Sequence, residues 1–190
     1  VLARLAEAGY IAFAADIYGK GVRPTNASEA GAQAGRYKAD RALLRERVNA
    51  GLARLREVPG VDAKKIAAIG YCFGGNTVLE LARSGADVAG VVSFHGGLDS
   101  PSSADGKNIK AKVLVLHGAD DPSIKPEDLT AFQQELRAAK VDWQFIAYGG
   151  AVHAFTQKTA KHPPAALYDP VAERRSWAHF KLFLAELFGN

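Results

Sequence analysis

The hydrophobic residues of the chain fall into two kinds of stretch that alternate along the sequence. Five short runs are almost wholly apolar, which is typical of strands buried on both faces of a parallel sheet; they span residues 10–15, 65–69, 88–94, 113–116 and 143–148. Between these runs, apolar residues recur at the spacing of amphipathic helices. This spacing predicts helices over residues 27–35, 40–58, 73–83, 126–139 and 172–188, and residues 1–8 resemble the end of a further helix.

This alternation predicts an α/β fold with a mostly parallel sheet and helices on both faces. Loops that contain glycine, aspartate or histidine follow the expected strands. In an open α/β sheet such loops gather at the carboxyl edge, so we expect the functional site there. A chain of 190 residues that is 48% hydrophobic is long enough for one well-buried domain. We therefore predict a single domain over residues 1–190.

Residues 66–81 read as a strand, a glycine-framed turn and a helix, with Cys72 at the turn. A side chain on such a sharp turn has a strained backbone, so small neighbours such as Gly70 and Gly74 are expected two positions before and after it. The helix that follows would direct its N–H groups and positive dipole end at Cys72, which favours the thiolate. It would also offer the Phe73 N–H to a developing oxyanion. The alternative is an inert buried cysteine among chance glycines.

Three strand ends offer a nucleophile, an acid and a base in the order Cys72, Asp121, His153. This is the chain order of an α/β-hydrolase triad, in which the base follows the last strand. A thiol needs a base to become a thiolate, and the base needs a carboxylate on its other nitrogen to fix its tautomer. His153 is favoured because it lies on a glycine-rich loop after the last expected strand.

Other residues compete for the roles of acid and base. Asp121 precedes Pro122, which favours a loop conformation, whereas Asp120 suits a turn or cap. We therefore favour Asp121 as the acid and keep Asp120 as the alternative. Four further histidines are interpreted as structural: His95, His117, His162 and His179.

Composition narrows the classes of partner and compartment. The net charge is +4, but basic residues alternate with acidic ones and form no basic tract, so we expect no nucleic-acid partner. No apolar run is long enough to span a membrane, and the first residues do not resemble a signal peptide. The single cysteine excludes an internal disulfide and a multi-thiolate zinc site. A cytoplasmic protein without a metal is expected.

Three segments together resemble the dienelactone hydrolase (carboxymethylenebutenolidase) family: Gly-Tyr-Cys-Phe-Gly-Gly at 70–75, Gly-Ala-Asp-Asp-Pro at 118–122 and Gly-Ala-Val-His-Ala-Phe at 150–155. Asp-Ile-Tyr-Gly at 16–19 resembles a further motif of that family. The resemblance extends over essentially the whole chain. It implies an α/β-hydrolase fold, a Cys-Asp-His triad, hydrolysis of a small lactone or ester through a thioester, and no cofactor. The alternative is a thiol redox sensor or a non-catalytic α/β scaffold.

The chain departs from the family pattern in two respects. Two arginines that would grip a substrate carboxylate correspond to Lys20 and Gln157, so bidentate recognition of a carboxylate is weakened. Lys20 and Arg23 are still expected to attract an anion, and Tyr71 is a further candidate for substrate binding. The family's N-terminal strands, with the second oxyanion donor, have no counterpart before residue 1. We therefore expect an N-terminally incomplete domain; the sequence specifies neither the natural substrate nor the oligomeric state.

Overall fold

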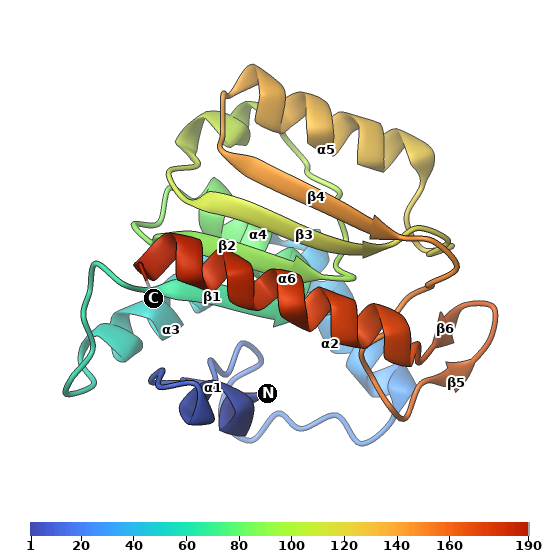
Figure 1. Ribbon diagram of the computed structural model, residues 1–190, viewed down its shortest axis with the longest axis horizontal. Helices are drawn as coiled ribbons and strands as arrows, with labels where there is room; N and C mark the ends of the chain where they lie inside the picture. The colour runs from blue at the N-terminus through green and yellow to red at the C-terminus, as the bar shows by residue number, and fades with distance from the viewer. Residues whose placement is uncertain (190) are drawn as a thin grey trace. The chain divides into compact units, whose positions relative to one another are not determined.

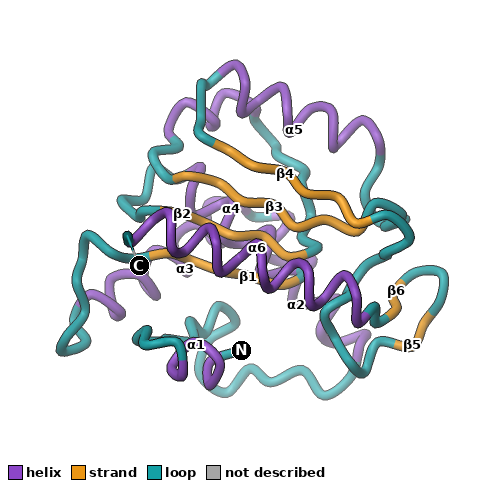
Figure 2. The backbone as a smooth tube through the Cα atoms, in the orientation of Figure 1, coloured by secondary structure: helices purple, strands orange, loops and turns teal. Residues whose placement is uncertain are grey.

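The computed structural model describes residues 1–189, which divide into two compact units, residues 1–63 and the part from residue 64 onward. The first unit contains three helices: α1 (Leu2–Glu7), α2 (Ala27–Ala39) and α3 (Arg41–Arg56). The second contains a parallel sheet with its helices (Figures 1 and 2). The prediction of a single domain stays a prediction. None of the helices described is long and apolar enough to cross a membrane.

The helices of the first unit begin at side-chain caps. The carboxamide oxygen of Asn26 accepts the backbone N–H of Glu29 at 2.9 Å, which fixes the start of α2. The carboxylate of Asp40 accepts the backbone N–H of Leu43 at 2.9 Å and begins α3. Both helices were predicted, although α2 is one turn longer than its apolar pattern indicated.

The strand predicted over residues 10–15 is wrong, because this segment has no regular secondary structure. A strand needs the N–H and C=O groups of a neighbouring strand, and none of the described strands pairs with this segment. Ile11 and Phe13 remain 52% and 42% exposed. Apolar composition alone therefore did not make a strand here.

The second unit is built on four parallel strands in the order in which they occur along the chain. The strands are β1 (Ala67–Tyr71), β2 (Gly90–Phe94), β3 (Lys112–Gly118) and β4 (Trp143–Tyr148). Helix α4 (Phe73–Arg83) connects β1 to β2, and α5 (Pro126–Ala138) connects β3 to β4. This alternation confirms the predicted α/β class.

Helices cover both faces of β2, which is why all its residues are buried. The Phe94 ring packs edge-on against Phe180 of α6 (Pro170–Phe188), with ring centroids 5.7 Å apart. Ser93 points to the opposite face and packs against Gly75 of α4. If Gly75 had a Cβ atom, that atom would lie only 2.6 Å from Ser93 Oγ. In Figure 1, α6 accordingly crosses in front of the sheet and α4 lies behind it. Because both faces are covered, β2 is apolar apart from Ser93 and does not alternate between apolar and polar residues.

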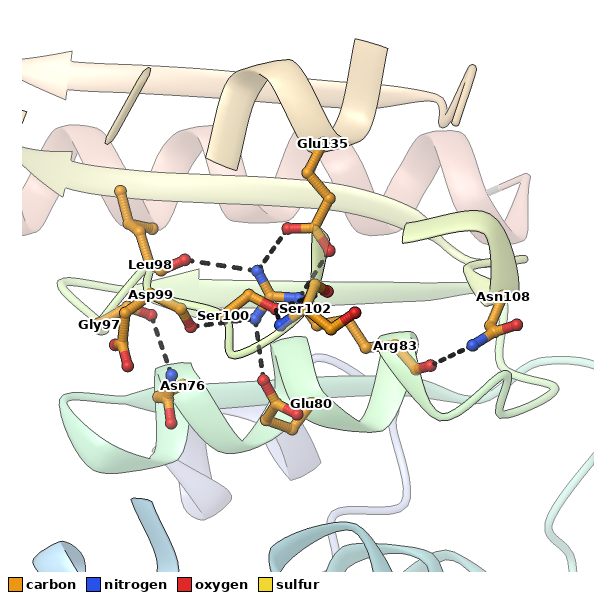
Figure 3. Close-up of polar contacts among 10 residues, drawn as sticks. All are labelled: Asn76, Glu80, Arg83, Gly97, Leu98, Asp99, Ser100, Ser102, Asn108 and Glu135. Carbon is orange, nitrogen blue, oxygen red and sulfur yellow. Dashed lines mark hydrogen bonds and ion pairs between the residues drawn. The ribbon is translucent and has the colours of Figure 1, made fainter. Parts of the chain in front are cut away.

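A buried charge cluster ties α4 to α5 and to the loop after β2 (Figure 3). The Arg83 guanidinium donates to both carboxylate oxygens of Glu135, at 3.0 and 2.7 Å, and to Glu80 at 2.9 Å. It also donates to the backbone carbonyl of Leu98 at 3.3 Å. All three charged side chains are at most 1% exposed. The helix that begins next to Cys72 is therefore fixed at its far end by paired charges.

The remaining elements are short connections and the final helix. A 3₁₀ helix, η1 (Ser103–Asn108), precedes β3. A small antiparallel pair, β5 (Lys161–His162) and β6 (Ala166–Leu167), precedes α6. Asp169 caps α6 by accepting the N–H groups of its first turn.

Candidate active site

Cys72 lies between β1 and α4 in a backbone conformation that side chains rarely adopt. Its φ is 52° and its ψ is −117°, whereas the ordinary regions for a non-glycine residue lie at negative φ. Such strain costs roughly 1–3 kcal/mol and persists where the surrounding structure enforces it. The Cys72 N–H donates to the carbonyl of Phe94 at 3.1 Å, which anchors the turn to the next strand. The predicted elbow is therefore present.

The three side chains predicted as nucleophile, acid and base lie together at the carboxyl edge of the sheet. The Nδ1–H of His153 donates to Asp121 Oδ2 at 2.9 Å. The other carboxylate oxygen, Oδ1, accepts the backbone N–H and the hydroxyl of Ser123, at 2.9 and 2.6 Å. His153, Cys72 and His95 each present a ring nitrogen or sulfur within 4.8 Å of the others. Asp121 is thus fixed on both oxygens while His153 faces the sulfur.

The same contacts shift the ionisation of the pair. The hydrogen bond to Asp121, together with the neighbouring sulfur of Cys72, raises the pKa of His153 to about 10. Burial pushes the pKa of Asp121 upward, but the hydrogen bonds from His153 and Ser123 outweigh it and hold that pKa below its ordinary value. The geometry therefore favours a charged imidazolium held by a carboxylate.

Asp120, the alternative acid, does not contact His153. Its carboxylate accepts the backbone N–H of Gly150 at 2.8 Å and so ties the loop after β3 to the loop that carries His153. Asp120 is exposed, whereas Asp121 is buried. The structure therefore gives Asp120 the structural contact expected of a turn residue.

His95 is the residue near Cys72 that the sequence analysis did not single out. Its Nδ1 lies 3.4 Å from Cys72 Sγ and accepts the Cys72 N–H at 3.3 Å. Its ring also packs against those of His153 and Phe155, with centroids 5.5 and 5.0 Å away. The sequence feature that could have identified His95 is its position directly after β2, at the same edge of the sheet as Cys72. Its interpretation as a core residue was incomplete.

The residues predicted to bind substrate fall into different places. Tyr71 stacks on Phe94, with ring centroids 4.5 Å apart, directly before Cys72. Lys20 and Arg23 belong to the first unit, where Arg23 forms an ion pair with Asp16 at 3.3 Å. Their contact with substrate stays a prediction. Gln157, by contrast, lies beside the predicted nucleophile: its side-chain amide donates to Cys72 Sγ at 3.6 Å.

Phe73, the predicted oxyanion donor, is the first residue of α4 and follows Cys72 directly. Its N–H belongs to the first turn of a helix, where backbone dipoles favour negative charge. The donor atoms of Cys72, His95 and His153 also form a sulfur and nitrogen set of the kind that zinc prefers. In the structure, His153 Nδ1 is bonded to Asp121, and His95 Nδ1 lies 3.4 Å from Cys72 Sγ.

Comparison with known proteins agrees with this geometry. The family model described as "Dienelactone hydrolase family" matches residues 1–188. An uncharacterised protein of Caenorhabditis elegans is 36% identical over 152 residues, which cover 76% of this chain and 94% of that protein. A putative carboxymethylenebutenolidase of Yersinia pestis is 30% identical over 163 residues, covering 80% of this chain and 60% of that protein.

A solved structure has nearly the same fold. The crystal structure of a dienelactone hydrolase-like promiscuous phosphotriesterase from metagenomic libraries superposes with a TM-score of 0.92. The two are 44% identical, and the match covers 97% of this chain and 77% of that one. With a match over nearly its whole length and the same sheet architecture, this chain belongs to the dienelactone hydrolase family of α/β hydrolases.

Proposed function

We propose that this protein hydrolyses a small lactone or ester through a Cys72–Asp121–His153 triad and a thioester intermediate. The observation that carries the proposal is the placement of His153 between Asp121, at 2.9 Å, and the sulfur of Cys72. Strained backbone of the kind seen at Cys72 clusters at active sites, which supports the proposal. Family membership supports the same class of reaction.

In the first half of the reaction Cys72 reacts as the thiolate while His153 holds the proton, and the thiolate attacks the carbonyl carbon of the substrate. The carbonyl electron pair moves to oxygen, where the Phe73 N–H donates to it. The carbon–oxygen bond of the ester then breaks, and the leaving alkoxide takes the proton from His153. In a lactone this alcohol remains part of the acyl group.

In the second half water hydrolyses the thioester. His153 removes a proton from the water as it attacks the acyl carbon, and the thiolate leaves when the tetrahedral intermediate collapses. Asp121 keeps Nδ1 protonated throughout, so that Nε2 faces the reacting atoms. The acid product departs and the enzyme returns to its starting state.

The test is turnover of p-nitrophenyl acetate and of a simple lactone by wild-type protein and two Cys72 variants. Cys72→Ala removes the nucleophile, and we expect hydrolysis to fall by about 10³-fold or more. Cys72→Ser should fold but react far more slowly, because the site does not activate a hydroxyl as it does a thiol. Acid-quenched wild-type protein should carry an acetyl group on Cys72, detectable by peptide mass spectrometry. Full activity of Cys72→Ala would refute the assignment.

The rival interpretation is a thiol sensor or scaffold without turnover, and the same assay separates it. A sensor could be acetylated once at Cys72 by p-nitrophenyl acetate, but it would release no p-nitrophenol beyond one equivalent. The metagenomic relative is named a promiscuous phosphotriesterase, so a phosphotriester such as paraoxon belongs in the substrate panel. Equal loss of all activities in Cys72→Ala would place them at one site.

A further inference from the structure

His95 lies at the elbow but has no role in the reaction proposed above. Its side chain is fully buried, and its Nδ1 lies 3.4 Å from the sulfur of Cys72. His153 presents a second ring nitrogen to the same sulfur, and the three donor atoms all lie within 4.8 Å of one another. One sulfur and two imidazole nitrogens are a donor set that suits zinc, whereas magnesium and calcium prefer oxygen ligands.

The spacing of these donors is close to what a tetrahedral zinc ion requires. Zn–S bonds of about 2.3 Å and Zn–N bonds of about 2.0–2.1 Å place the sulfur and a nitrogen about 3.5 Å apart. The sulfur of Cys72 and Nδ1 of His95 already lie at this separation. Two nitrogens on one zinc ion lie about 3.3 Å apart, so a donor at the outer limit of 4.8 Å must move by about 1.5 Å. Small rotations of the Cys72 and His153 side chains can supply that movement, because the His153 side chain is 27% exposed and is not enclosed by packing.

Each histidine also has the outer partner that a zinc-bound imidazole uses. A ligating histidine almost always hydrogen-bonds through its second nitrogen, which fixes the orientation of the ring. The Nδ1 of His153 is bonded to Asp121 at 2.9 Å, which leaves Nε2 for the metal. The Nε2 of His95 lies 2.7 Å from Thr156 Oγ1. A hydroxyl can accept as well as donate, so it suits a ring whose Nδ1 is occupied and whose Nε2 carries the proton.

The turn at Cys72 stays bonded when Nδ1 of His95 is taken by a metal. The Cys72 N–H lies 3.3 Å from that nitrogen, but it also donates to the carbonyl of Phe94 at 3.1 Å. The side of the cluster away from His95 is open, because Cys72 and His153 are partly exposed and Gln157 is exposed. A hydrated ion can therefore reach the three donors, and water can fill the fourth position.

We propose that Cys72, His95 and His153 form a zinc-binding site at which the ion reversibly inhibits the enzyme. The ion occupies the sulfur that acts as the nucleophile and the nitrogen that transfers protons, so the bound enzyme cannot turn over. The sulfur binds as a thiolate and both rings bind as neutral imidazoles, and the proton held by the Cys72–His153 pair passes to solvent. The inhibition rests on the proposed function, whereas the binding can be measured without turnover.

Cobalt(II) is the spectroscopic probe of binding, because it occupies zinc sites and absorbs visible light. Wild-type protein should bind one cobalt ion per chain, with the visible bands of a four-coordinate ion and a charge-transfer band from sulfur to cobalt. Zinc should remove these bands, because it binds such donors more tightly than cobalt does. Wild-type protein alkylated at its single cysteine, Cys72, is the control and should lose the charge-transfer band. Equal binding by the alkylated protein, or a complex without that band, would overturn the proposal.

Substitutions of histidine test which nitrogens bind the metal. His95→Asn removes one ligand, and asparagine tolerates the left-handed backbone at this position, where φ is 39°. Loss of an outer partner usually costs about 10–100-fold in metal affinity, so loss of a ligand in His95→Asn or His153→Ala should cost at least about 100-fold. Thr156→Val, which removes only the outer partner of His95, should cost about tenfold. His162→Asn is the matched control at an exposed histidine and should bind zinc as wild type does. Unchanged affinity in His95→Asn would overturn the proposal.

Inhibition is measured as hydrolysis of p-nitrophenyl acetate by wild-type protein. At a free zinc concentration about ten times the Kd, mass action should leave about a tenth of the activity, and EDTA should restore the rest. Magnesium at the same concentration should have no effect, because it prefers oxygen ligands. Zinc binding without inhibition, or activation by zinc, would refute the inhibitory role. Undiminished ester hydrolysis by Cys72→Ala would instead refute the triad, and the cobalt spectrum would still decide whether the three residues bind metal.

Discussion

The backbone carbonyl of Gly74 lies inside the space that a Cβ on Gly70 would occupy, whereas a Cβ on Gly74 would meet no other atom within 4 Å. The two glycines that flank Cys72 are therefore not equivalent. Gly70 is needed because the first turn of α4 passes directly over it. At Gly74 there is room for a side chain. The sequence analysis had expected both positions to require glycine for the same steric reason.

This difference predicts opposite results for two alanine substitutions. Gly70→Ala should destabilise the protein by at least about 1–3 kcal/mol, the usual cost of overpacking, because the obstacle is backbone that cannot rotate away. Gly74→Ala should be neutral or slightly stabilising, since it replaces glycine within a helix. Urea unfolding followed by circular dichroism measures both. Equal destabilisation would contradict the geometry.

The elbow was predictable because it is local: strand, turn and helix are adjacent in the sequence. The contact of His95 with Cys72 was not, because it depends on the parallel register of β1 and β2. Tyr71 pairs with Phe94, so the next residue of each strand, Cys72 and His95, emerges side by side. The same limitation explains the wrong strand over residues 10–15, where only a pairing partner could have decided the structure.

The assignment of the acid predicts a contrast between two adjacent aspartates. Asp121→Asn keeps the shape but removes the charge that stabilises the His153 imidazolium, and it permits the wrong tautomer. We expect kcat for p-nitrophenyl acetate to fall on the order of 10³–10⁴-fold. Asp120→Asn should mainly weaken the contact with the Gly150 N–H and lower stability. The reverse pattern in kcat would exchange the two roles.

The raised pKa of His153 predicts a pH-dependent contribution to stability. A histidine whose pKa is higher in the folded than in the unfolded state stabilises fully below its unfolded value, about 6.5. This contribution is lost as pH rises through the folded pKa, about 10. The gap in unfolding free energy between wild type and His153→Ala should therefore shrink from about pH 6 to about pH 10. Urea titrations along this range measure it.

Asp121→Asn provides the control for that experiment. Without the carboxylate, the main cause of the raised pKa of His153 is gone. The gap between Asp121→Asn and the double variant with His153→Ala should then depend much less on pH in the same range. A gap that shrank equally in both backgrounds would show that Asp121 is not the source of the effect.

The buried cluster of Arg83 predicts a large loss of stability from a single substitution. Burial lowers the pKa of Arg83, but its two carboxylate partners outweigh this effect and raise it, so the guanidinium is charged. Arg83→Met would leave Glu80 and Glu135 buried without their cation, at a cost of about 3–5 kcal/mol. Urea unfolding near neutral pH measures the change.

A matched substitution at the surface separates burial from charge. Lys112 also pairs with two carboxylates, Asp142 and Glu186, at 3.2 and 2.6 Å, but these side chains are 38–62% exposed. Lys112→Met should therefore cost far less than Arg83→Met, because water solvates the carboxylates that it leaves behind.

Neutralising the whole cluster tests the physical reason for the loss. In a triple variant with Arg83→Met, Glu80→Gln and Glu135→Gln, the two carboxylates of this cluster are replaced by neutral amides, so much of the stability lost in Arg83→Met should return. If the triple variant were as unstable as Arg83→Met alone, the loss would come from the packing of the arginine side chain against α5 and the loop after β2. Recovery would instead show that the buried carboxylates left without Arg83 cause the loss.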